Sequence, residues 1–90
     1  MRYGIISDIH SNVFALGVVL KELNRRSPDG YLCCGDIVGY GSRPNECCDL
    51  VRELNPKVVV GNHDLAAFRE GTEDWFNAQA RAAALWTREQ

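Results

Sequence analysis

Three short polar segments of this sequence carry side chains of the types that bind metal ions in proteins. They are Asp8-Ile9-His10, Gly35-Asp36 and Gly61-Asn62-His63-Asp64. A set that combines carboxylate oxygen with imidazole nitrogen suits zinc, manganese or iron, whereas oxygen ligands alone would indicate magnesium or calcium. If folding brings the three segments together, they form a site for divalent metal ions.

The spacing within these segments agrees with metal binding. Asp8 and His10 lie two residues apart, so on an extended segment both side chains point to the same side and can hold one ion. Asp36 follows Gly35, which lets the backbone turn tightly and leaves both carboxylate oxygens free to bridge two metals. Asn62 offers a neutral amide oxygen.

An alternation of strands and helices is expected to position the three segments. Short apolar runs predict strands at 2–6, 31–34 and 57–60, and apolar residues at helical spacing predict helices at 13–26, 44–55 and 77–90. This order implies an α/β fold with parallel strands, right-handed crossovers and both faces of the sheet covered. Each polar segment follows a strand, so all three should meet at the carboxyl edge of the sheet, where such sheets bind ligands.

The same segments resemble the first three signature blocks of the calcineurin-like metallophosphoesterases. The matching residues are Asp8-x-His10, Gly35-Asp36-x-x-Gly39 and Gly61-Asn62-His63-Asp64, in this order and at these separations. The continuation Ser11-Asn12 and the turn Gly39-Tyr40-Gly41 further resemble the small bacterial and archaeal members. The resemblance implies that residues 1–90 form a parallel β-α-β-α-β unit, the N-terminal half of a four-layer α/β/β/α sandwich.

The resemblance also implies hydrolysis of phosphate monoesters or diesters by a metal-bridging hydroxide at a two-metal site. Asp8 and His10 would bind the first ion, Asp36 would bridge both, and Asn62 would bind the second. The implied cofactors are two divalent ions, either manganese, iron, zinc, nickel or magnesium. The implied substrate is a phosphate-ester small molecule or a phosphoprotein.

Two further residues receive catalytic roles from the resemblance. His63 would contact the phosphate and stabilise charge or protonate the leaving oxygen. Asp64 would orient the His63 ring, in the way that a carboxylate holds a histidine in one tautomer.

Other polar and aromatic residues allow two interpretations each. Asn12 either contacts substrate or caps the helix that follows it, and Arg43 either reaches the substrate phosphate or is a solvated charge. Trp75, Phe76 and Trp86 either belong to the core or an interface, or line a base-stacking pocket.

The sequence departs from the family pattern in its histidines. Family members supply an isolated histidine and then a Gly-His-x-His segment after the third block, whereas this chain contains only His10 and His63. We therefore expect a truncated domain that is inactive or weakly active by itself. One apolar face of its sheet should be uncovered, and two copies of the chain could associate through this face. The alternative is a catalytically inactive metal-binding or protein-interaction module of the same fold.

The net charge, the lengths of the apolar runs and the cysteines indicate which partners and which cellular compartment to expect. The formal net charge of −2 argues against an obligate nucleic-acid partner. No apolar run approaches the ~20 residues of a membrane span, and the N-terminus lacks the layout of a signal peptide, so we expect a cytoplasmic protein without a membrane partner. The four cysteines, in two adjacent pairs, are then expected to be core or half-buried reduced thiols.

Overall fold

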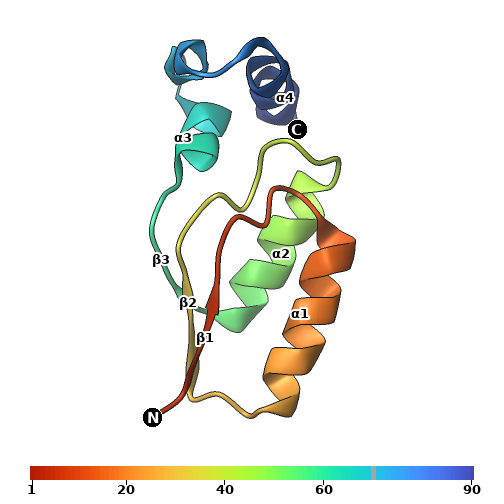
Figure 1. The fold of residues 1–90 in the computed structure, drawn as a ribbon, viewed down its shortest axis with the longest axis vertical. Helices are drawn as coiled ribbons and strands as arrows, with labels where there is room; N and C mark the ends of the chain where they lie inside the picture. The colour runs from red at the N-terminus through yellow and green to blue at the C-terminus, as the bar shows by residue number, and fades with distance from the viewer. Residues whose placement is uncertain (70) are drawn as a thin grey trace.

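The fold is a small parallel sheet with helices on one side and a helical cap beyond its carboxyl edge (Figure 1). The computed structural model describes residues 1–69 and 71–90. Three strands pair in the order β1-β2-β3, and the elements are β1 Tyr3–Ile6, α1 Val13–Arg25, β2 Gly30–Cys33, α2 Pro44–Leu54, β3 Lys57–Val58, α3 Asn62–Phe68, the 3-10 helix η1 Thr72–Trp75, and α4 Ala78–Arg88. The predicted parallel α/β fold is confirmed.

The register of the strands aligns their carboxyl ends. Ile6 of β1 lies opposite Cys33 of β2, and Cys33 lies opposite Val58 of β3. The third strand is shorter than the predicted 57–60, because its partner β2 ends at Cys33; beyond Val58 one backbone hydrogen bond remains, from the Val59 N–H to the Cys33 carbonyl at 3.1 Å. All three strands therefore release the chain at the same edge.

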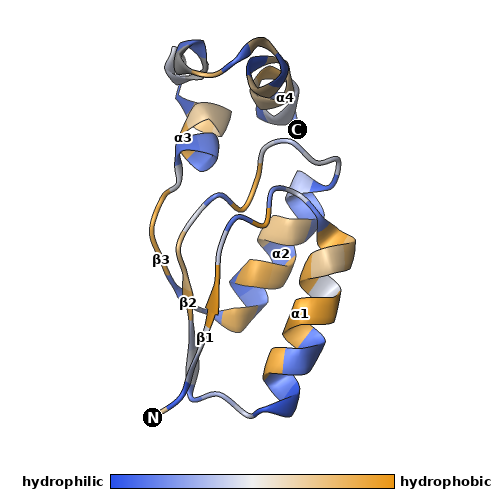
Figure 2. Ribbon diagram, in the orientation of Figure 1, coloured by the Kyte–Doolittle hydropathy of each residue, from blue (hydrophilic) through white to orange (hydrophobic). Residues whose placement is uncertain are grey.

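The hydrophobic core lies between the sheet and two helices. Figure 2 shows α1 and α2 beside the strands, each with broad apolar bands. The buried cluster consists of Ile6, Leu16, Leu20, Cys33, Cys47 and Val51. Alternation along β1 sends Ile6 into this core and its neighbour Ile5 to the opposite face.

The opposite face of the sheet is uncovered and apolar. Tyr3, Ile5 and Val58 are 50%, 64% and 48% exposed, respectively. Among residues 1–69 and 71–90, helices thus cover one face of the sheet only, in line with the expected uncovered face. Self-association through this face stays a prediction. In the part of the chain that the structure describes, none of the helices has the length and apolar character needed to cross a membrane.

The helix starts follow local sequence signals. The Asn12 side chain accepts a hydrogen bond from the Ala15 N–H at 3.1 Å and caps α1, and Pro44 occupies the first turn of α2. Helix α3 begins at Asn62, so the third polar segment forms its first turn. The last helix starts after Asn77, whose side chain accepts from Ala80 N–H at 2.8 Å.

The four cysteines differ in their exposure, which predicts selective chemical labelling. Cys33 and Cys47 are buried and Cys48 is half-buried, as expected, whereas Cys34 is exposed and so departs from the expected core or half-buried position. Burial raises the pKa of the Cys33 and Cys48 thiols and raises that of Cys47 to about 11. Since the thiolate is the reactive form, we expect iodoacetamide at pH 8 to label Cys34 first and the others only on unfolding. Mass spectrometry of timed digests checks this, and equal labelling of Cys47 and Cys34 would contradict the packing.

Candidate metal centre

Backbone pairing continues past the strands and aligns the first two polar loops. The Asp8 N–H donates to the Gly35 carbonyl at 3.1 Å, and the His10 N–H donates to the Asp36 carbonyl at 3.0 Å. These hydrogen bonds hold the loop after β1 next to the loop after β2. This pairing brings Asp8 and His10 next to Asp36, although at least 25 residues separate them along the chain.

The backbone in these loops is left-handed at several residues other than glycine. Asp8, His10 and Asp36 have φ of 53°, 49° and 54°. The expectation that Asp8 and His10 lie on an extended segment is therefore wrong, because each occupies the left-handed region that few residues adopt outside turns. Such conformations cost of order 1 kcal/mol or more each and cluster at functional sites, where the surrounding structure holds them.

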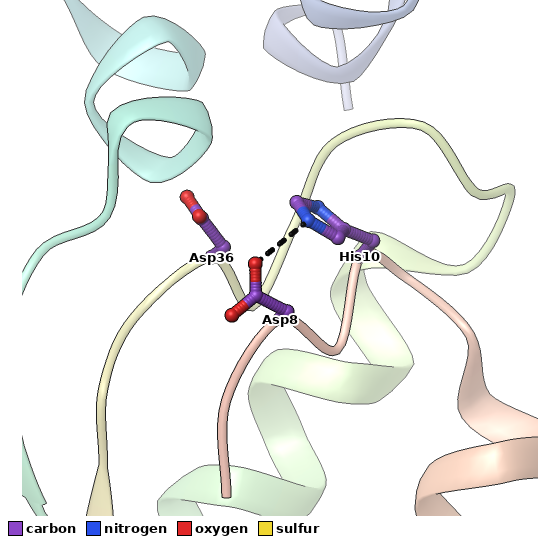
Figure 3. A group of neighbouring side chains, drawn as sticks. All are labelled: Asp8, His10 and Asp36. Carbon is purple, nitrogen blue, oxygen red and sulfur yellow. Dashed lines mark ion pairs between the residues drawn. The ribbon is translucent and has the colours of Figure 1, made fainter.

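Asp8, His10 and Asp36 converge despite this difference (Figure 3). One ligand atom from each lies within 4.8 Å of the others, and Asp8 Oδ1 is 3.4 Å from His10 Nε2. A hydrogen bond from the Ser7 hydroxyl, at 2.6 Å, together with the nearby His10 ring, lowers the pKa of the Asp8 carboxyl. Asp8 is thus ionised at neutral pH and exposed to solvent, as a metal ligand requires.

The hydrogen bonding of His10 leaves one ring nitrogen available for a metal. Nδ1 lies 3.1 Å from the Val38 carbonyl oxygen, which can only accept, so Nδ1 carries the proton and donates. Nε2 then has the free lone pair and faces Asp8. A carbonyl that fixes the tautomer in this way is the usual support of a metal-binding histidine.

Asn62 contacts Asp36 in a way that also fits a cation. Its side-chain amide lies 3.2 Å from both carboxylate oxygens of Asp36. With its nitrogen turned inward, the amide donates to the carboxylate; with its oxygen turned inward, three oxygen atoms face one another, which a cation between them would stabilise. Asp36 itself is fixed by the His63 N–H, which donates to Oδ1 at 3.0 Å. The donor set therefore fits a divalent metal ion.

The His63 ring is buried beside this group. It stacks on Phe76 with ring centroids 4.5 Å apart, and its centroid is 4.8 Å from that of His10. Burial, and then the nearby His10, lowers the pKa of His63, so the ring is neutral at pH 7. Within residues 1–69 and 71–90, Nδ1 of His63 has no hydrogen-bond partner. A buried polar atom without a partner indicates a ligand site or a catalytic role.

The Asp64 carboxylate is hydrogen-bonded to backbone groups in this structure. Its Oδ1 accepts from the Val38 N–H at 3.0 Å, and its Oδ2 accepts from the Gly61 N–H at 3.2 Å. The physical reason is that Asp64 lies in the first turn of α3, where a carboxylate turns back to the free N–H groups at the helix start. Asp64 ties α3 to Val38, the residue whose carbonyl holds His10.

Asn12 and Arg43 line the solvent-filled cavity next to the group. This cavity of about 460 Å³ also exposes Asp8, His10 and Tyr40. Asn12 is engaged as the cap of α1, and Arg43 Nη1 pairs with Glu46 at 3.1 Å. Both side chains are thus on the cavity wall but bound to groups of their own helices.

Two aromatic neighbours of the centre were not singled out for it from the sequence. Tyr40 has its ring centroid 5.0 Å from that of His10 and 4.4 Å from that of His63, and Phe76 covers the other side of His63. The only signal for Tyr40 is its place in the Gly39-Tyr40-Gly41 turn. The side chain of Trp75 lies outside the described part of the structure.

The sequence and the fold of this chain are similar to those of known proteins. A metallophosphoesterase from Sphaerobacter thermophilus has a similar structure, with a TM-score of 0.77 and 47% identity, over 100% of this chain and 37% of that one. An uncharacterized protein of Methanocaldococcus jannaschii is 49% identical over 84 residues, which are 93% of this chain and 35% of the relative. A symmetrical bis(5'-nucleosyl)-tetraphosphatase of Actinobacillus pleuropneumoniae is 34% identical over 64 residues, 68% of this chain and 24% of the relative.

The chain thus spans about a third or less of the length of these relatives. The sequence model of one family, described as calcineurin-like phosphoesterase, matches residues 1–90, the whole of the chain. The chain belongs to the calcineurin-like phosphoesterase family.

Proposed function

We propose that this protein carries part of a phosphate-ester hydrolysis site that works with divalent metal ions. One observation supports this most: carboxylate and imidazole donors from two distant loops lie within 4.8 Å of one another in a chain of a phosphoesterase family. Parallel sheets bind their ligands at this edge. The reaction is the hydrolysis of a phosphate monoester or diester.

The proposed ligands divide between two ions. Asp8 and His10 would hold the first ion, Asp36 would lie between both, and Asn62 would hold the second. The ions, proposed to be manganese, would supply Lewis-acid polarisation of the ester and hydroxide at neutral pH. The left-handed backbone and the carbonyl support of His10 hold these donors before any ion arrives, which reduces the entropy lost on binding.

His63 is proposed to act on the phosphate. Its ring lies beside His10 and is neutral, with an unpartnered nitrogen. A bound phosphate brings negative charge next to the ring, which raises the pKa of the ring and lets it donate a proton toward the leaving oxygen. Asp64 would contribute indirectly: it accepts a hydrogen bond from the Val38 N–H, and the Val38 carbonyl in turn accepts one from the His10 ring.

The proposed substrate is a small phosphate ester or a phosphoprotein. The relationship to a nucleosyl tetraphosphatase favours the small molecule. The cytoplasm is the proposed location, because free cysteines persist in a reducing compartment.

A second candidate is a binding module of the same fold without catalysis. It is favoured by the exposed apolar sheet face, which a partner protein or a second copy would cover. In that case the metal centre would stabilise the loops, and hydrolysis would be absent.

The hydrolysis of a chromogenic phosphodiester such as bis(p-nitrophenyl) phosphate tests the proposal. This chain and a longer form carrying the further histidine blocks of the family are compared with manganese and with a chelator. We expect metal-dependent turnover in the longer form and little in residues 1–90, since two histidines do not complete two metal sites. If the longer form is inert with every divalent ion tried, the binding module is the better explanation.

A further inference from the structure

A second pocket adjoins the metal centre and has a different character. It holds about 210 Å³ and is lined by Tyr40, Gly41, Ser42, Ala83 and Trp86. Its two aromatic side chains come from the loop after β2 and from α4, and they are 56% and 42% exposed, respectively. The pocket therefore offers two large aromatic surfaces to solvent.

Packing of α4 does not account for the position of Trp86. The helix buries its small residues Ala80 and Ala84, together with Thr87. These lie on one side of the helix at a spacing of three to four residues, whereas Trp86 remains nearly half exposed toward Tyr40. An exposed tryptophan opposite an exposed tyrosine is more typical of a binding site than of a core.

The two pockets share the loop 40–42 as a common wall. Tyr40, Gly41 and Ser42 line both the aromatic pocket and the larger cavity, which Asp8, His10 and Arg43 also line. The Tyr40 ring contacts the His10 ring, with centroids 5.0 Å apart. The larger cavity thus presents candidate metal ligands, and the aromatic pocket on the same loop presents two aromatic rings.

This division matches one class of molecule. A phosphate group is bound by positive charges, such as those of metal ions. A heterocyclic base stacks on aromatic side chains through its ring face, and this stacking does not depend on which hydrogen-bonding groups the base carries. The aromatic pocket is smaller than the ~300–1,000 Å³ of sites that enclose a whole ligand, so it has room for a ring system only.

We propose that Tyr40 and Trp86 form the base site for a nucleoside phosphate whose phosphate group lies at the metal centre. This inference rests on the proposed phosphoesterase function and narrows its substrate class. Trp86 acts there as a specificity-determining residue, since it lines the aromatic pocket and lines none of the cavity that holds Asp8 and His10.

Calorimetric titration with two matched ligands tests the base site. AMP and ribose 5-phosphate share the phosphate and the sugar and differ in the base. With manganese present, we expect the wild-type chain to bind AMP about tenfold more tightly than ribose 5-phosphate, the size typical of one stacked base. Trp86→Ala should remove this preference and leave the affinity for ribose 5-phosphate unchanged, whereas Trp86→Phe should keep most of it. Phe68→Ala, which removes another exposed aromatic side chain outside the pocket, should behave as wild type.

The outcomes separate the base site from the function on which it rests. Equal, manganese-dependent binding of both ligands to the wild type would overturn the base site and leave the phosphoesterase proposal standing. A preference for AMP that survives in a folded Trp86→Ala variant would also overturn it. If neither ligand binds in a manganese-dependent way to this chain or to the longer form with the further histidine blocks, both the proposed function and the base site fail. Circular dichroism of each variant establishes that it is folded, and Trp86→Phe supplies the comparison if the alanine variant is not.

Discussion

Replacing Asp36 with Asn is expected to weaken manganese binding by about a hundredfold or more. Loss of a residue that only supports a metal ligand costs about 10–100-fold in affinity, and loss of a ligand's charge costs at least as much. The change keeps an oxygen that can accept from the His63 N–H, so the fold should survive. Titration calorimetry of the chain measures the affinity, and phosphodiester hydrolysis by the longer form should fall by a similar factor.

Asp49→Asn is the matched control for this variant. Asp49 lies on α2, exposed to solvent and paired with Arg52 at 3.4 Å, away from the metal centre. Its removal changes the net charge by the same amount, and exposed ion pairs contribute little to stability. If Asp36→Asn binds manganese as well as Asp49→Asn does, Asp36 is not a ligand and the proposed centre is wrong.

Replacing Gly61 with Ala is expected to disrupt the centre through packing alone. An added Cβ would lie 2.5 Å from Asp36 Cγ and would also overlap the Asp36 backbone nitrogen. The loop after β3 would have to move away from Asp36, at a cost of about 1–3 kcal/mol in the free energy of unfolding. Because Asn62 follows directly, manganese affinity should fall as well, by about tenfold.

A glycine without close neighbours provides the control. Nothing lies within 4 Å of a Cβ added at Gly17, which is in the middle of α1. Gly17→Ala should therefore raise the free energy of unfolding by about 0.5–1 kcal/mol and leave the manganese affinity unchanged. Urea denaturation of the two variants compares them, and an unfolding midpoint for Gly61→Ala at or above wild type would show that the loops are not packed as described.

The arrangement of the strands was predictable because its signals are local. Apolar runs of strand length predict the three strands, and apolar residues at helical spacing predict α1, α2 and α4, each to within a few residues. The order of the elements then requires parallel strands, and parallel strands place the polar segments at one edge. The proximity of Asp8, His10 and Asp36 follows from these steps without any information on side-chain contacts.

The conformation within the loops was not predictable in the same way. The left-handed backbone at Asp8 and His10 depends on hydrogen bonds to a loop more than 25 residues away, which no spacing along the chain reveals. Asp64 likewise has one partner close in sequence, Gly61, and one distant partner, Val38. The role implied by the resemblance concerned the ring of His63, whereas both carboxylate oxygens of Asp64 accept from backbone N–H groups.

The aromatic surroundings of the centre were the hardest part to foresee. Phe76 and Trp86 were ambiguous between core and pocket, and the structure gives them different environments. Phe76 stacks on the buried His63 ring, while Trp86 stays nearly half exposed beside Tyr40. Which of these environments a residue meets depends on the path of the chain after α3, and no strand pairing or strong turn signal determines that path.

The backbone bonds that join the loop after β1 to the loop after β2 make the two edges of the sheet unequal. At the carboxyl edge, Asp8, His10 and their partners are matched residue by residue, so one inserted residue would shift every donor out of line. At the other edge, the short connections before β2 and β3 carry none of the metal-binding donors. During divergence of this family, changes in chain length should therefore accumulate at that edge, while the ligand edge keeps a constant length.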